Sequence, residues 1–516
     1  MNVNGSFFMK SRKGENIHDS KLDYRACVER VNDYISQNST ELYESANQDM
    51  TFEQRKSTVM RYIHEYIEKF TPQLEDKRYQ NAEGGMDYER LAADLIDEIC
   101  NYDKLTDAMT DDEVTEIQIN NGCVPGGIWV ERKGKTEPLR DPVTHDLVYF
   151  EKEEDVTKFI NNLLKHSKIT INATASLVNG TTIEGYRIAA THSTATARPK
   201  GDTQRSPQAV IRKFSTTRLE LEDLVRFKSI SSDMAAFLAI LPRVDLTAAF
   251  VGSTGCGKTV ALQAMLRHAP LNKRIGMIQN PAEIDLSEKD DDGAELRNFF
   301  SWEAKDLKGD LAKQSTSSTY PNMMNHALRN TPELFVFGEL RSNEEFALSM
   351  KAAASGHYFY TTYHAEDAEG AINRYTEAVL SASEGGGGSE NLTKATICSH
   401  VRFIVVQKRL ADGTRKILSI NEICGSEHRA GMVVPKINTI FKYFPDPSGK
   451  RDETGKLLGY HAQVGTVSQK TRDDLVLSGA TPENMKVINR ELPNGEPIIG
   501  DYDYLKAREA IEKGSM

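Results

Sequence analysis

The residues best suited to chemistry form a glycine-rich turn at 252–259, GSTGCGKT. Its spacing fits the pattern GxxxxGK[ST] without a mismatch, and a strand-like run (TAAFV) precedes it while a helical run (VALQAMLRH) follows it. Glycines allow the backbone to turn its N–H groups inward around phosphate oxygens, and the start of the helix adds a favourable dipole. The sequence therefore predicts a binding site for the phosphates of a nucleoside triphosphate.

Each residue of this turn has an expected part in binding. Lys258 is expected to reach the β- and γ-phosphates, and the Thr259 hydroxyl is expected to ligate Mg²⁺. Cys256 has two interpretations: the surrounding amides lower the pKa of its thiol, or, as we favour, it is a small residue that fits the turn. The positions that complete the phosphate-binding turn are Gly252, Ser253, Thr254, Gly255, Cys256 and Gly257.

Hydrolysis also needs a group that orients the attacking water. The run LFVF at 334–337 is typical of a buried parallel strand, and the Gly338-Glu339 pair that follows it is expected at the ligand-binding edge of the sheet. Glu339 is therefore our candidate for polarising the water, against the alternative of a solvated glutamate at a strand end. Glu283 follows a second strand-like run, RIGMIQNPAEIDL, and is a candidate water or Mg²⁺ contact that composition explains equally well as a surface carboxylate.

Two histidines, His357 and His364, flank an apolar aromatic run at 358–363. Seven residues of strand span roughly 23 Å, so the two histidines cannot share one metal ion. His364 stands at the C-terminal end of the run, where it is expected to lie near Glu339 and to sense the γ-phosphate. For His357 we prefer the simpler interpretation of a histidine that caps a buried strand.

The elements around these residues predict an α/β protein with several parts. Strands and helices alternate from about residue 240, which favours a sheet with parallel strands, and an acidic segment at 285–310 is expected to be a surface excursion. An amphipathic helix at 51–70 is expected to pack within its own domain rather than against a partner. The predicted parts are a helical extension at 1–100, a small α+β domain at 101–214, a linker at 215–239, the phosphate-binding α/β domain at 240–435 and a C-terminal extension of unknown role at 436–516.

Composition limits the setting in which the chain acts. The formal net charge of −11 argues against broad electrostatic capture of nucleic acid, which needs a basic face. The six cysteines form no CxxC pair, so a zinc ribbon or a disulfide framework is not expected. No signal peptide and no apolar run of about 20 residues is evident. We therefore predict a cytoplasmic protein that does not insert into a membrane and meets one only through partners.

Together these segments resemble the secretion-superfamily ATPases, which are the traffic ATPases of type IV secretion and conjugation, type II secretion and type IV pili. The resemblance spans about residues 105–430 and follows the order of the family's motifs. The phosphate loop of that family is similar to GSTGCGKT, its Asp box to IQNPAE (278–283), its atypical Walker B to FGELR (337–341), and its histidine box to AASGHYFYTTYHAEDAEGAINR (353–374). Outside the motor motifs, DDEVTEIQIN (111–120) resembles the opening strand of the N-terminal domain, and IVVQKRLADGTRKILSINEI (404–423) resembles a strand, turn and strand of the conjugation and tight-adherence members.

The resemblance implies a RecA-like motor domain in a homo-hexamer, with ATP and Mg²⁺ bound between the N-terminal and motor domains. It also implies peripheral attachment at the inner membrane, through the membrane components of a secretion or pilus machine. Lys258, Thr259, Glu283, Glu339 and His364 stand at the family's motif positions. The resemblance further assigns Arg187 and Arg212 as charge-stabilising arginines, for which Arg198 and Arg205 compete.

Two positions depart from the family's pattern. Gln279-Asn280 stand where the Asp box usually has Glu-Asp, and Ser342 follows Glu339-Leu340-Arg341 where Asp is usual. Because Glu283 and Glu339 remain, we expect ATP hydrolysis. The rate is expected to be lower if the two acids absent from the Asp box contribute to the reaction. The family's paired CxxC motif is absent, which favours conjugation-type or retraction-type rings. The leading hypothesis is a hexameric motor ATPase of such a machine, and the alternatives are a nucleic-acid translocase ring and a nucleotide-binding scaffold with weak hydrolysis.

Overall fold

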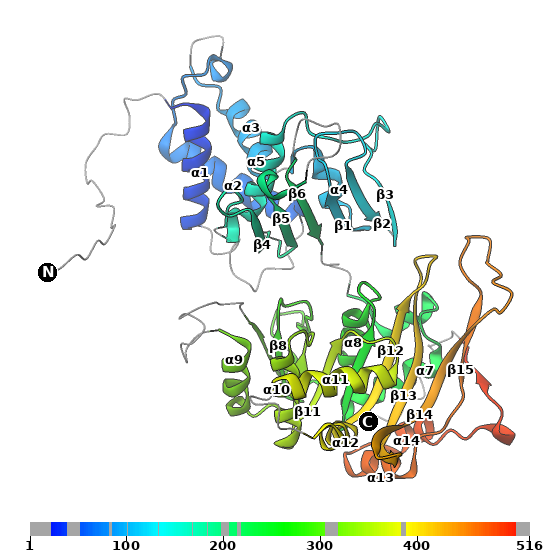
Figure 1. Ribbon diagram of the computed structural model, residues 1–516. Helices are drawn as coiled ribbons and strands as arrows, with labels where there is room; N and C mark the ends of the chain where they lie inside the picture. Colours follow the sequence, from blue (N-terminus) through cyan, green and yellow to red (C-terminus); the bar gives the residue numbers. More distant parts are fainter. Residues whose placement is uncertain are drawn as a thin grey trace. The chain divides into compact units, whose positions relative to one another are not determined.

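The computed structural model of the chain describes residues 22–38, 52–81, 85–100, 102–132, 134–167, 169–182, 184–197, 206–213, 218–304, 318–382 and 389–501. The chain divides into two compact units, Met1–Thr216 and Thr217–Met516 (Figure 1). Each unit has its own hydrophobic cores, and each is described by itself.

The first unit begins with the helices α1 (Tyr24–Asn38), α2 (Phe52–Phe70) and α3 (Tyr88–Cys100). The apolar residues of α2 recur at spacings of three and four, so they share one face of the helix. That face is buried against side chains of α1 and α3, such as Val31 and Leu95. The predicted helix at 51–70 is therefore present, and it packs inside its own unit.

A six-stranded antiparallel sheet forms the rest of the first unit, in the order β3-β2-β1-β6-β5-β4. Ile117, Ile188 and Ile211 of its central strands share a core with Val156 and Ile160 of α5. One helix-covered face and alternating burial along the strands are typical of a small α+β domain, as predicted. The elements are α4 (Thr106–Thr110), β1 (Val114–Ile119), β2 (Ile128–Arg132), β3 (Lys135–Pro138), α5 (Glu153–Leu164), β4 (Leu177–Thr181), β5 (Arg187–Thr191) and β6 (Gln208–Arg212).

The second unit is built on a ten-stranded sheet in the order β16-β15-β14-β13-β12-β7-β11-β10-β8-β9. From β12 to β9, each strand pairs in parallel with the next one along this order. This arrangement confirms the predicted α/β class with a parallel-stranded core. The parallel strands are β7 (Thr247–Gly252), β8 (Ile275–Gln279), β9 (Phe299–Glu303), β10 (Leu334–Phe337), β11 (Tyr358–Tyr363) and β12 (Val401–Arg409).

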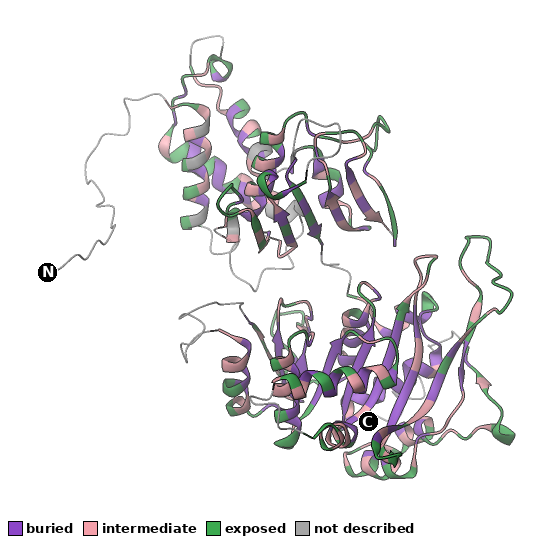
Figure 2. Ribbon diagram, in the orientation of Figure 1, coloured by how far each residue is buried: buried purple, intermediate pink, exposed green. Residues whose placement is uncertain are grey.

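Helices cover both faces of these parallel strands. Successive residues of β7 point to opposite faces, so Ala248 and Phe250 enter one core while Ala249 and Val251 enter the other. Figure 2 shows the central strands buried and the outer sides of the helices exposed. The first core includes α6 (Leu221–Arg226), α7 (Ser232–Ile240) and α8 (Lys258–Leu266), and the second includes α9 (Tyr320–Ala327), α10 (Asn343–Ala354), α11 (Ala368–Ala382) and α12 (Glu390–His400).

Three expectations about the chain's organisation are corrected. The stretch 215–239 contains α6 and most of α7, both buried in a core, and is not a linker. The surface excursion expected at 285–310 is corrected in part: residues 289–296 are exposed, but the run FFSWE forms β9 and pairs with β8 at the edge of the sheet. The boundary expected at 435 falls inside β14 (Met432–Pro445), so the chain beyond it continues the same sheet.

The sheet continues beyond β12 through antiparallel strands β13, β14, β15 and β16. Among the described residues, no helix combines the length and the apolar character required to cross a bilayer. The elements of this last part are β13 (Arg415–Arg429), β14 (Met432–Pro445), β15 (Gly459–Gln463), α13 (Gln469–Leu477), α14 (Pro482–Ile488) and β16 (Ile498–Ile499).

Candidate active site

Three neighbouring parallel strands end at one edge of the sheet and carry the predicted site residues. The strand β7 runs into the phosphate loop, β11 is followed by His364, and β10 is followed by Gly338-Glu339. Because β11 pairs with both β7 and β10, the residues after these strands are brought together. This edge is where open α/β sheets bind their ligands.

The phosphate loop needs glycine at fixed positions. Gly255 and Gly257 have φ angles of 70° and 91°, which residues with a Cβ rarely adopt. Gly252 has a φ of 154°, and a Cβ there would lie 2.0 Å from the carbonyl oxygen of Gln407. Gly257 is also the N-cap residue of α8, so the loop leads directly into the start of a helix. The backbone therefore has the form that a phosphate-binding loop requires.

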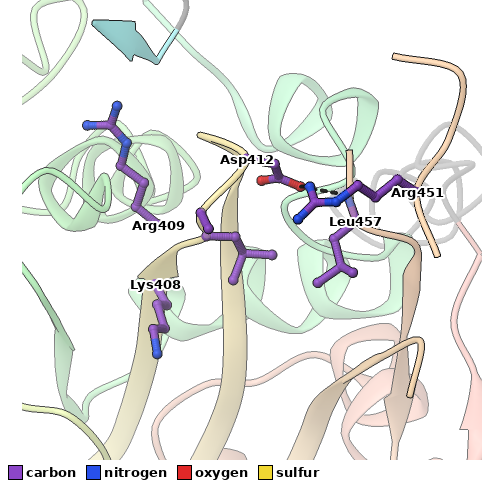
Figure 3. Close-up of a pocket in the computed structure, with 7 residues that line it drawn as sticks. Lys408, Arg409, Asp412, Arg451 and Leu457 are labelled. Carbon is purple, nitrogen blue, oxygen red and sulfur yellow. Dashed lines mark hydrogen bonds and ion pairs between the residues drawn. The ribbon is translucent and has the colours of Figure 1, made fainter. Parts of the chain in front are cut away.

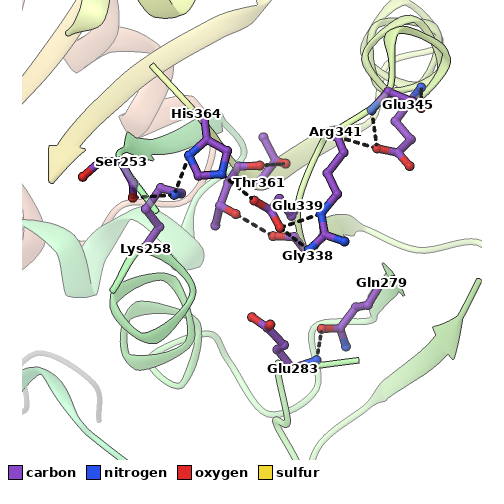
Figure 4. A network of polar contacts seen from close by, with 12 residues as sticks. Ser253, Lys258, Gln279, Glu283, Gly338, Glu339, Arg341, Glu345, Thr361 and His364 are labelled. Carbon is purple, nitrogen blue, oxygen red and sulfur yellow. Dashed lines mark hydrogen bonds and ion pairs between the residues drawn. The ribbon is translucent and has the colours of Figure 1, made fainter. Parts of the chain in front are cut away.

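Lys258 is the first residue of α8, directly after the turn, and is only 6% exposed. Its Nζ donates to the carbonyl oxygens of Gly252 at 3.2 Å and of Ser253 at 3.1 Å. The same atom lies 3.4 Å from Nδ1 of His364 (Figure 4). The lysine and the histidine, predicted from separate motifs, are thus in direct contact.

Glu339 is held by two basic side chains. Its Oε1 lies 3.2 Å from Nε2 of His364, and its Oε2 accepts a hydrogen bond from Nε of Arg341 at 2.8 Å. Burial opposes ionisation, but Arg341, His364 and Lys258 outweigh it and lower the pKa of Glu339 below its ordinary value of 4.5. The carboxylate is therefore ionised at neutral pH, as an acceptor for a water proton must be.

The backbone around Glu339 is also fixed. The hydroxyl of Thr362, a buried residue of β11, donates to the carbonyl oxygen of Gly338 at 2.8 Å. The N–H of Leu340 donates to the carbonyl oxygen of Thr362 at 2.9 Å. Both peptide groups next to Glu339 are thus tied to the neighbouring strand, which limits where the carboxylate can lie.

The Gln279 substitution has a structural explanation. Its buried amide accepts from the N–H groups of Glu283 and Ile284 at 3.0 and 2.8 Å, and it donates to the carbonyl of Ile284 and the hydroxyl of Ser301 at 3.0 and 3.1 Å. A carboxylate could accept the first two bonds but could not donate the others. Gln279 therefore organises the segment that carries Glu283, and in this chain it serves as a structural residue.

The Ser342 substitution is explained by helix capping. Ser342 is the N-cap of α10, where its side chain accepts from the N–H of Glu345 at 3.3 Å and its own N–H donates to the Glu345 carboxylate at 3.1 Å. Serine and aspartate are about equally good at this position. The absence of the usual aspartate therefore leaves the start of the helix intact.

The other residues of the phosphate loop and the Asp box lie as follows. Thr259 is half-buried in the first turn of α8, beside Lys258. Glu283 is half-buried, and in Figure 4 it lies beside Gln279. Cys256 is buried, and burial raises the pKa of its thiol. Burial and the raised pKa favour the interpretation of Cys256 as a small residue that fits the loop.

Of the predicted arginines, Arg187 and Arg212 belong to the first unit. They are direct neighbours across β5 and β6, and Arg212 also faces Glu116 of β1. Their action on a nucleotide stays a prediction. Arg198 and Arg205 lie outside the described residues.

The sequence motifs assign no role to three residues that contact the phosphate loop or Glu339. Arg341 lies within FGELR, and its position two residues after Glu339 is the signal that could have identified it. Gln407 and Arg415 contact the phosphate loop from β12 and β13, and the strand-turn-strand pattern at 404–423 that contains them does not mark them as loop contacts. Such contacts depend on which strands become neighbours in the folded sheet.

The parallel sheet, the glycine loop and the helix that follows it define a phosphate-loop α/β protein. The family model described as "Type II/IV secretion system protein" matches residues 108–427. The chain therefore belongs to this family, and the resemblance inferred from the motifs is confirmed.

Individual relatives are distant. An uncharacterised protein of Methanocaldococcus jannaschii is 23% identical over 377 residues, which cover 71% of this chain and 61% of that protein. The type IV secretion system protein VirB11 of Brucella suis is 23% identical over 335 residues, which cover 60% of this chain and 86% of VirB11. The X-ray structure of the Legionella pneumophila ATPase DotB aligns with 61% of this chain and 77% of its own, at 20% identity and a TM-score of 0.41. The chain thus spans about three fifths of the M. jannaschii relative.

Proposed function

We propose that this chain is an ATPase that powers a secretion, conjugation or type IV pilus machine. The observation that carries the proposal is the continuous contact from Lys258 through His364 to Glu339, at the edge where β7, β11 and β10 end. The lysine belongs to the phosphate loop, and the glutamate is ionised. A phosphate-binding group and a carboxylate base therefore lie at the same edge of the sheet.

In the proposed reaction the loop amides and Lys258 hold the β- and γ-phosphates, and Glu339 orients and polarises the attacking water. His364 contacts both Lys258 and Glu339, so the presence of a γ-phosphate at the lysine changes the hydrogen bonds of the ring that orients the carboxylate. Thr259 stands in the first turn of α8, and its hydroxyl would hold Mg²⁺, with Glu283 as a second candidate contact for that ion or the water. Mg²⁺, when bound, supplies positive charge against the phosphate oxygens.

The names of the relatives support a proposal for the setting of the activity. The name of VirB11 places that relative in a type IV secretion system, and other relatives are a competence protein of Bacillus subtilis and a twitching motility protein of Neisseria gonorrhoeae. We infer that this chain acts as a homo-hexamer in the cytoplasm, attached to the inner membrane through components of such a machine. The net charge of −11 still disfavours the alternative of a nucleic-acid translocase.

Phosphate release tests the proposal. The wild-type chain should release phosphate from ATP, and Glu339→Gln should reduce the rate by about 100-fold or more, as expected when a positioned base is lost. The same variant should bind ATP with nearly unchanged affinity, because the phosphate loop is untouched. The variant Glu344→Gln, which changes another glutamate close by in the first turn of α10, is the control and should keep the wild-type rate.

Two outcomes would contradict the proposal in different ways. Equal, near-zero rates for wild type and Glu339→Gln, with ATP bound by both, would instead favour the nucleotide-binding scaffold. A rate that rises with DNA and falls steeply with salt would favour the translocase. The mass of the ATP-bound assembly tests the hexamer separately.

A further inference from the structure

The hairpin of β12 and β13 lies directly against the phosphate loop. The strand β12 pairs in parallel with β7, and Gln407 stands opposite Gly252 in this register. At the other end of the turn, Arg415 is the first residue of β13, and its Nε donates to the carbonyl oxygen of Gly255 at 3.0 Å. The hairpin therefore contacts both the beginning and the middle of the loop.

Both side chains also border the last glycine of the loop. A Cβ added to Gly257 would lie 3.1 Å from Nε2 of Gln407 and 3.2 Å from Cδ of Arg415. Gln407 is only 4% exposed, so it is packed closely against this side of the loop. The loop thus rests on the hairpin.

We propose that Arg415 is a positioning residue that orients the phosphate loop for nucleotide binding. The proposal rests on the function proposed above. In a trans peptide the C=O group and the following N–H group point in opposite directions. By holding the carbonyl of Gly255 toward the hairpin, Arg415 directs the N–H of Cys256 away from it, as a donor for a phosphate oxygen.

Arginine suits this task because its charge is permanent and its guanidinium is rigid. Hydrogen bonds from a charged donor are roughly twice as strong as neutral ones. The bond therefore resists the tendency of a glycine-rich loop to sample other backbone conformations. A loop that is already in the binding conformation loses less conformational entropy when the nucleotide binds.

The turn that precedes Arg415 is itself fixed, which keeps the arginine in place. Asp412, whose side chain is 4% exposed, accepts from the N–H and the hydroxyl of Thr414 at 2.9 and 2.6 Å. Its second oxygen accepts from the N–H of Leu457 at 2.6 Å and lies 4.0 Å from Nη1 of Arg451 (Figure 3). The connection between β14 and β15 therefore anchors the turn, and through it the position of Arg415.

ADP affinity, measured by calorimetry on the full chain, tests the proposal without a chemical step. Arg415→Ala should weaken ADP binding by about tenfold or more, the effect expected for one hydrogen bond from a charged group. Arg415→Lys keeps a cationic donor and the stem beside Gly257, so its affinity should fall between those of Arg415→Ala and the wild type. Arg429→Ala removes an exposed arginine at the far end of the same strand and should bind ADP like the wild type.

Steady-state kinetics separates positioning from a general structural effect. For Arg415→Ala the KM for ATP should rise while kcat changes little, because the reacting groups remain. An ADP affinity equal to that of the wild type would overturn the proposal. If Arg415→Ala does not fold, the ADP affinity of Arg415→Lys is the test. A wild-type affinity in Arg415→Lys would then overturn the proposal. A wild-type chain that binds no ADP would contradict the function proposed above rather than the role of Arg415.

Discussion

Nε2 of His364 lies 3.2 Å from Oε1 of Glu339, and the other ring nitrogen of His364 contacts Lys258 of the phosphate loop. One imidazole thus joins the group proposed to bind phosphate to the group proposed to orient water. A change on either side alters the hydrogen bonds of the same ring.

The first prediction concerns this histidine. His364→Ala should reduce kcat for ATP hydrolysis by about 100-fold, because Glu339 loses a partner that orients it, while ATP affinity changes much less. His357 is the matched control, since it stands at the other end of the same strand and its ring lies beside Ser355 and Phe335. His357→Ala should hydrolyse ATP at the wild-type rate. Equal losses in the two variants would contradict a role for His364 at the site.

The second prediction concerns the Asp box. Gln279→Glu places a carboxylate at a buried position and removes the N–H donors to Ile284 and Ser301. The variant should lose about 1–3 kcal/mol of unfolding free energy and should not hydrolyse ATP faster. Denaturant unfolding and phosphate release measure the two effects. A faster and equally stable variant would indicate that the glutamine is a catalytic defect and not a structural residue.

The third prediction is a pH dependence of stability. His461 is fully buried next to Lys416 and Tyr443, its Nε2 contacts the carbonyl of Ile417, and burial lowers its pKa from 6.5 to about 4. The folded state therefore disfavours the charged ring, so stability present above pH 6.5 is lost as the pH falls toward 4. The loss attributable to this group is on the order of 3 kcal/mol.

The variant His461→Gln removes the titration, so its unfolding free energy should fall less than that of the wild type between pH 6.5 and 4. Urea unfolding at several pH values measures the difference. His428→Gln changes an exposed histidine of β13 and should follow the wild type. If the unfolding free energies of the wild type and His461→Gln fall equally with pH, another group is responsible for the loss of stability in acid.

The fourth prediction concerns the arginines of the first unit. Arg187 and Arg212 are neighbours across two strands, and Glu116 stands opposite Arg212 on the other side. If they neutralise the phosphates, Arg187→Ala and Arg212→Ala should each reduce kcat by about 1,000-fold. Arg132→Ala is the control, since Arg132 is paired with Asp111 and Glu137. Wild-type rates of ATP hydrolysis in Arg187→Ala and Arg212→Ala would show that these arginines take no part in the reaction.

The parallel core and the main site residues could be predicted because their signals are local. The strands β7, β10 and β11 are short apolar runs, and each is followed by a residue able to do chemistry. Parallel strands end at a common edge, so Lys258, His364 and Glu339 were expected to come close without knowledge of any contact.

The remaining features depend on long-range packing. The helix α7 is apolar on all sides because both the sheet and other helices cover it, so it shows no helical periodicity. The roles of Gln279 and Arg415 depend on partners that only the folded chain brings near, such as Ser301 and Gly255. Ser342 seemed a departure because the family's motif records a residue type, whereas the structure shows a capping function that serine also performs.

The pairing of β13 with β14 has a practical consequence for anyone who shortens this protein. Cutting the chain at residue 435, where the family resemblance fades, would divide β14 and leave much of the 15-residue strand β13 as an open edge. Open edges of this length recruit other strands and promote aggregation. A fragment intended for crystallisation or for single-turnover work should therefore extend through β16, at residue 499, because Leu475 and Ile488 beyond β15 also belong to the core.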